Sequence, residues 1–247
     1  MKKEITLILL LLLPIATVYF SLKWGHDGLT TMAVTTILCY SIMCWLYDKV
    51  IADFKWSWFV GKETNNFCSK MFDGIGFTLM FAVITAAVLI CFSIFSPWGI
   101  DKMVLPFPNF GNNWDIVYVV VFGICYNIIL PMGEEAFYRV FQANQWKGFI
   151  SDIMINLAYA GMNLAAFYWI MEPWGGRWLF TGLAFLSGMM LVSIRDNMSV
   201  VYALMTRIGI SLGVSVWLFF LYESVKNDLP RQQPDYFFIA DTRNYLN

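Results

Sequence analysis

Charged side chains are scarce in this sequence. Asp, Glu, Lys and Arg together make up 13% of the 247 residues, hydrophobic residues make up 59%, and the mean hydropathy is +0.62. A water-soluble domain of this length cannot cover its surface with so few charges. Lipid is therefore the solvent that we expect around most of the chain.

Basic clusters and sets of metal ligands are lacking as well. The net charge is −1 and no long run of Lys and Arg occurs, which argues against a nucleic-acid partner. The single histidine, His26, lies outside the long apolar runs. The five cysteines show neither a disulfide framework nor the spacing of metal ligands. We expect no metal and no cofactor.

Long apolar runs are what the sequence does contain, and they do not alternate as membrane β-strands do. Because lipid satisfies no backbone hydrogen bond, these runs predict an all-α fold, a polytopic membrane helix bundle. The first run follows a basic start as a signal peptide does, but no small-x-small cleavage site follows it, so we expect a retained helix. About seven transmembrane helices are expected, near residues 5–22, 29–51, 74–96, 114–138, 150–171, 177–194 and 199–222.

The chain divides into three predicted regions. Residues 1–113 hold three N-terminal helices with their loops, residues 114–222 form a core of four helices, and residues 223–247 are a polar C-terminal tail. Lys and Arg are concentrated in the loops on the side of the N-terminus, which places that terminus inside. The pattern does not select a membrane, since an energy-transducing inner membrane such as the mitochondrial one, an endomembrane and a bacterial plasma membrane all accept such helices.

Four charges stand where a bilayer makes them costly. They are Glu134 and Glu135 near the end of the fourth predicted helix, Arg139 one turn on, and Arg207 in the seventh. An unpaired charge at a helix centre costs about 2.5–3.5 kcal/mol on insertion scales, which favours pairing. Glu135 and Arg139 are i and i+4, so they share a face and are expected to form an ion pair, whereas Glu134 is rotated by about 100°. We expect Arg207 within hydrogen-bonding distance of Glu134 or Glu135.

Polar stripes on two other predicted helices must also face the bundle interior, since lipid would reject them. An ordinary reading is that these side chains form interhelical hydrogen bonds, helped by small residues that let helices approach closely. The stripes are Asp152, Asn156, Tyr159 and Asn163 on the fifth helix and Arg207, Ser211 and Ser215 on the seventh; the small residues are Gly182, Gly188, Gly209 and Gly213.

The segment from Gly133 to Arg139 reads GEEAFYR and resembles the EExxxR motif of the CPBP (Abi) family of intramembrane proteases, which includes the CAAX prenyl endopeptidases. The resemblance covers roughly residues 114–222. Where the family has a Phe-x-x-x-His motif on the next helix, this chain has Tyr159 and Asn163. In the later His-x-x-x-Asn motif, Thr206 or Arg207 stands at the histidine position and Ser211 at the asparagine position.

The resemblance implies a site as well as a fold. In the family the first Glu activates the attacking water, a role that would fall to Glu134, and histidines and an Asn orient that water or stabilise the oxyanion. The family-equivalent site residues here are Glu134, Glu135, Arg139, Asn163 and Arg207. Asn163 and Arg207 can donate hydrogen bonds, but neither can exchange a proton as histidine does.

These substitutions favour a catalytically degenerate CPBP-like protein, a pseudoprotease that serves as a structural or accessory subunit of a membrane protein complex. Its expected partners are other membrane subunits and lipids. The alternative is an active glutamate-type intramembrane endopeptidase that cleaves prenylated or membrane-anchored peptides, with Glu134 as base and Asn163 and Arg207 as donors. A transporter or lipid-binding protein that uses the polar cavity is a third class, which no specific feature favours.

Overall fold

The computed structural model describes residues 2–24, 28–42, 67–95, 116–142, 148–170 and 174–225. These residues are helical apart from short turns, with no β-strand among them, which confirms the all-α prediction. Six of their helices are long and apolar enough to cross a membrane: Glu4–Lys23, Ser69–Phe95, Val120–Tyr138, Phe149–Tyr168, Gly176–Asn197 and Val200–Phe220. The protein is therefore a multi-pass helical membrane protein.

Most of the predicted spans coincide with helices of the structure. In chain order they are α1 (Lys2–Lys23), α2 (Gly28–Val34) with its π-helical continuation η1 (Thr35–Ile42), α5 (Phe67–Phe95), α6 (Ile116–Ile124), η3 (Cys125–Ile129), α7 (Leu130–Glu134), η4 (Glu135–Gln142), α9 (Phe149–Ile170), α10 (Trp174–Asn197) and α11 (Val200–Val225). The elements α6, η3, α7 and η4 follow one another without a break and together form the fourth helix.

Several predicted boundaries are wrong. Helix α5 begins at Phe67 rather than at residue 74, because its polar first turns contain no helix breaker and can stand in the interfacial region. The fourth helix continues to Gln142, so its two adjacent carboxylates lie inside a helix and not near its end. Helix α11 continues to Val225, past the predicted boundary at residue 222. The rest of the predicted tail and residues 43–51 of the second predicted helix lie outside the described residues.

The outer surfaces of the spans are apolar. Leu9, Leu79, Val83 and Leu186 are each more than 60% exposed, and exposed aliphatic and aromatic side chains recur along every long helix. Water would make such a surface costly at about 25 cal/mol per Å², whereas lipid tails match it. A smaller set of side chains is buried, and it includes polar and charged ones such as Glu134, Asn156 and Arg207.

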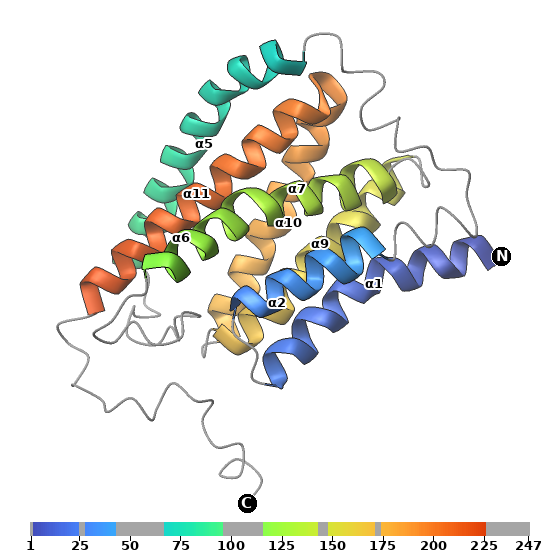
Figure 1. Cartoon of the computed structure of the whole chain (residues 1–247), viewed down its shortest axis with the longest axis horizontal. Coiled ribbons are helices and arrows are strands. Elements are labelled where there is room, and N and C mark those ends of the chain that lie inside the picture. The colour runs from blue at the N-terminus through green and yellow to red at the C-terminus, as the bar shows by residue number, and fades with distance from the viewer. Residues whose placement is uncertain are drawn as a thin grey trace, which may run out of the picture.

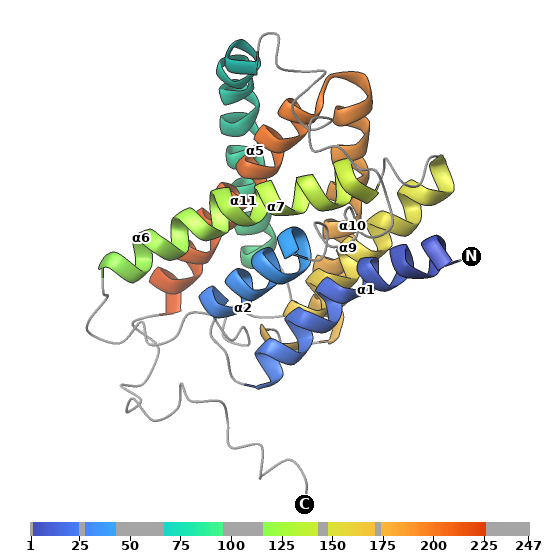
Figure 2. The same cartoon turned by 45° about the vertical axis from the view of Figure 1, so that its right-hand side comes forward.

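Two apolar clusters hold the described helices together. The first joins α1, η1, η4 and α9 and includes Leu10, Phe137 and Ile155. The second joins α5, α10 and α11 through Leu89, Phe180 and Trp217. Figures 1 and 2 show the same division, with α5 beside α11 on one side of the molecule and α1 with α2 on the other.

Close packing of α5 on α11 depends on glycine. A Cβ atom added to Gly213 would lie 2.6 Å from the carbonyl oxygen of Ala82, and one added to Gly209 would collide with the carbonyl oxygen of Thr78. The Thr78 hydroxyl donates a hydrogen bond of 2.9 Å to the carbonyl of Met205 across the same contact. Two glycines four residues apart thus let the backbones meet, as in GxxxG membrane dimers. Gly182 does not do this, since nothing lies within 4 Å of its Cβ position.

Candidate functional site

Glu134 lies at the end of α7, in the middle of the fourth helix, and only 2% of it is exposed. Pro131 belongs to the same short element, inside the continuous fourth helix, where it has no backbone N–H to donate to the preceding turn. The π-helical segments η3 and η4 flank α7 on both sides. Such segments are rare and occur often at functional sites in helices.

Arg207 of α11 binds Glu134 directly. Its Nε donates a hydrogen bond of 2.7 Å to Oε2 of Glu134, and its Nη2 forms an ion pair with the same oxygen. Arg207 is itself only 6% exposed. The expectation that Arg207 lies within hydrogen-bonding distance of Glu134 or Glu135 is confirmed, and Glu134 is the partner.

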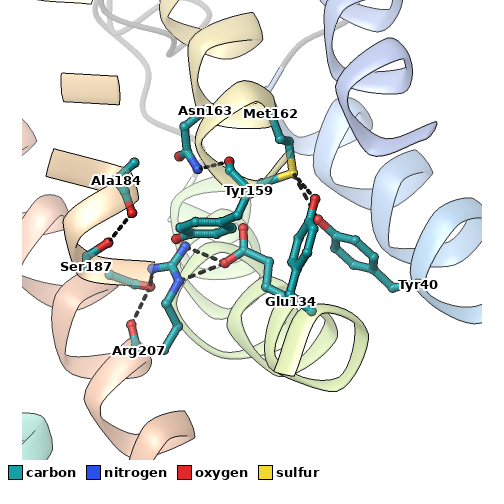
Figure 3. A network of polar contacts seen from close by, with 10 residues as sticks. Tyr40, Glu134, Tyr159, Met162, Asn163, Ala184, Ser187 and Arg207 are labelled. Carbon is teal, nitrogen blue, oxygen red and sulfur yellow. Dashed lines mark hydrogen bonds and ion pairs between the residues drawn. The ribbon is translucent and has the colours of Figure 1, made fainter. Parts of the chain in front are cut away.

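The remaining guanidinium nitrogen is also bound. Nη1 of Arg207 donates to the Ser211 hydroxyl at 2.8 Å, and that hydroxyl donates to the Arg207 carbonyl at 3.0 Å. The guanidinium carbon lies 5.9 Å from the centre of the Tyr159 ring, within cation–π range (Figure 3). Of Thr206 and Arg207, the residue that binds the carboxylate is therefore Arg207.

Aromatic side chains enclose the ion pair on the side of η1 and α9. Tyr138 contacts both Tyr159 and Tyr40, with ring centres 5.5 Å and 6.1 Å apart. The Tyr40 hydroxyl donates to the sulfur of Met162 at 3.0 Å (Figure 3). The Tyr138 hydroxyl approaches the same sulfur at 3.8 Å. No sequence pattern pointed to Tyr40 and Met162 as parts of this site, because a Tyr or Met inside an apolar run looks like an ordinary core residue.

The polar stripe of α9 faces the interior as predicted, but its members do not form one site. Asn156 is fully buried and donates to Met189 of α10 at 3.2 Å. Asp152, at the start of α9, forms a 3.8 Å ion pair with Arg195 at the end of α10. Asn163 donates to the carbonyl of Tyr159 on its own helix at 2.9 Å, and Figure 3 shows it turned toward that carbonyl.

The second carboxylate, Glu135, is as deeply buried as the first, with 2% of it exposed. The side chain of Arg139 lies outside the described part of the structure, as does His26. The predicted ion pair between Glu135 and Arg139 therefore stays a prediction. On α11, Ser215 lies at the next step of the predicted stripe after Ser211 and donates to the side-chain oxygen of Asn127 at 3.0 Å.

Within the described ranges, no group of three or more His, Cys, Asp or Glu side chains is arranged to hold a metal ion. The fold and the site define a polytopic helical membrane protein in which polar faces of the fourth, fifth and last helices meet at a buried ion pair. Comparison with known protein families, with curated proteins and with solved structures found no match to this chain.

Proposed function

We propose that this protein is a catalytically inactive relative of the CPBP intramembrane proteases that serves as a structural or accessory subunit of a membrane protein assembly. The observation that carries the proposal is the buried ion pair between Glu134 and Arg207. Glu134 is the residue that the resemblance makes the general base. Here a permanently charged guanidinium already binds its Oε2.

The ion pair opposes base catalysis for a simple energetic reason. To activate water, Glu134 would have to accept a proton, and the neutral carboxyl would then leave the Arg207 charge buried without its counter-charge. Breaking one side of a buried ion pair costs about 3–5 kcal/mol. A general base contributes only about 10²–10⁴-fold to a rate, which is of the same size in free energy. The pair would therefore cancel most of what the base could supply.

The hydrogen-bond donors that would assist a reaction are committed as well. The Asn163 amide is bound to the backbone of its own helix, and Ser211 bridges Arg207 to the backbone of α11. These two contacts lie within single helices, and all three guanidinium nitrogens of Arg207 are bound. The contact that joins two helices at this site is the ion pair between Glu134 and Arg207.

The subunit role is supported by the large open surfaces of the helices. Only 17% of the apolar window of α5 is buried within this chain, compared with 44% for α11. We place the N-terminus inside, since Lys and Arg gather in the loops on that side. Other membrane proteins and lipids are the partners that such a surface can accept.

Two measurements on the full-length protein test the proposal. The first is the native mass after extraction from its own membrane in mild detergent, by blue-native separation with mass spectrometry of co-migrating chains. We expect co-migration with a defined larger assembly. Migration alone or as a small homo-oligomer would remove the subunit role.

The second measurement is cleavage of prenylated and membrane-anchored peptides by the purified protein. We expect none above the background given by Glu134→Gln, the variant that removes the family's base. Cleavage by the native protein that Glu134→Gln abolishes and Asn163→Ala weakens would establish the active endopeptidase instead.

A further inference from the structure

Helix α7 contains only five residues and is bounded by π-helical turns at both ends. Each π-helical turn takes up about one residue more than an α-helical turn. One residue corresponds to about 100° of rotation on an α-helix. The places where the π-helical turns insert their extra residues therefore decide which side chains of α7 face α11. Glu134 and Glu135 differ by this one step, and both are buried.

The contact of Gly133 with Tyr40 of η1 fixes the rotation of α7 about its axis. A Cβ atom at Gly133 would lie 2.7 Å from Cδ2 of the Tyr40 ring, closer than carbon atoms can approach. Were α7 turned by one residue in either direction, Met132 or Glu134 would take this place. Both carry side chains that the Tyr40 ring excludes.

Tyr40 cannot easily yield to such a side chain. Its hydroxyl donates to the sulfur of Met162 at 3.0 Å (Figure 3). Its ring packs against Phe137, with the ring centres 5.2 Å apart. Only 3% of Tyr40 is exposed. The ring is therefore held by α9 on one side and by η4 on the other, and it presents a fixed surface to Gly133.

We propose that Tyr40 is a positioning residue that sets the register of α7 and thereby selects Glu134, and not Glu135, as the partner of Arg207. The selection follows from shape: Gly133 is the residue of α7 that fits against the ring, and the next residue along the chain then faces Arg207. This inference concerns the ion pair alone and holds whatever the protein does in its membrane.

The experiment compares how much each carboxylate matters in different backgrounds. Glu134→Gln and Glu135→Gln are made in the native protein, in Tyr40→Leu and in Tyr40→Phe, and the fall in unfolding temperature in detergent is measured for each. In Tyr40→Leu we expect the fall caused by Glu134→Gln to drop below half its native size and the fall caused by Glu135→Gln to increase. Tyr40→Phe keeps the ring against Gly133 and is expected to keep the native values.

A structural contact without control of register would lower stability but leave the preference between the two carboxylates unchanged. The proposal would therefore be overturned if, in Tyr40→Leu, each Gln substitution lowered the unfolding temperature by the same amount as in the native protein. Gly133→Ala crowds the same contact, but a one-residue turn would bring the larger Met132 or Glu134 against the ring, so this variant is expected to lose stability and keep the preference for Glu134. Loss of folding in Tyr40→Leu would also overturn the proposal, because the proposal gives that variant an alternative pairing through Glu135.

Discussion

At the scale of single residues, the pairing of Arg207 with Glu134 explains how two charges are tolerated in the interior of a membrane bundle. Either charge alone would cost about 2.5–3.5 kcal/mol at a helix centre. The 2.7 Å contact between them, with Ser211 and Tyr159 on the remaining sides of the guanidinium, replaces the lost water. The pair is neutral as a unit, and it ties the fourth helix to the last.

The first prediction concerns this pair. Arg207→Met leaves the Glu134 carboxylate buried without its counter-charge and is expected to destabilise the protein by about 3–5 kcal/mol. The double variant Arg207→Met with Glu134→Gln contains neither charge and should recover most of that loss. Thermal unfolding in detergent measures both. A double variant as unstable as the single one would show that the ion pair is not the origin of the loss.

The matched control is Arg195→Met. Arg195 pairs with Asp152 at 3.8 Å and also with its exposed neighbour Asp196, at the end of the bundle. Partly exposed ion pairs contribute about 0–1 kcal/mol. If Arg195→Met lost as much stability as Arg207→Met, the removal of any arginine, and not the loss of the buried ion pair, would explain the destabilisation.

At the scale of the elements, α11 is the helix that connects α5 to the fourth helix. It contacts α5 through Gly209 and Gly213, the fourth helix through Arg207 and Ser215, and α5 again through Trp217, whose indole N–H donates to Ser93 at 2.7 Å. In a bilayer no hydrophobic force draws apolar helices together, so close packing and such hydrogen bonds must supply the association.

The second prediction separates packing from helix propensity. Gly213→Ala forces a methyl group into the backbone of α5 and is expected to lower stability by about 1–3 kcal/mol, the usual cost of overpacking. Gly182→Ala is the control, since its Cβ would meet nothing within 4 Å. That change should be neutral or stabilise by up to about 1 kcal/mol through helix propensity. Equal effects in thermal unfolding would contradict the packing of α5 on α11.

How far the sequence predicted these elements follows from the physics of each signal. Apolar runs reveal where chains cross lipid, and the need for neutrality revealed the partnership of Arg207 with a glutamate. The start of α5 was predicted too late, because hydropathy indicates which residues contact lipid and not where the helix begins. The π-helical turns were missed because no residue pattern encodes one extra residue per turn. Tyr40 was missed because its role depends on where Gly133 comes to lie.

At the scale of the whole molecule, the seven crossings expected from the sequence and the distribution of Lys and Arg together predict opposite sides for the two termini, with the N-terminus inside. The third prediction is that a tag at the N-terminus is protected from protease added outside sealed vesicles or cells, whereas a tag at the C-terminus is digested. A soluble protein enclosed in the same compartment is the control for membrane integrity. Equal protection of both tags would contradict seven crossings.

Arg207 stands 73 residues after Glu134 in the chain. At a synthesis rate of about 5–20 residues per second, the carboxylate leaves the ribosome about 4–15 s before its partner exists. The ion pair can therefore form only after α11 has been synthesised, and a chain that stops before residue 207 lacks the counter-charge of Glu134.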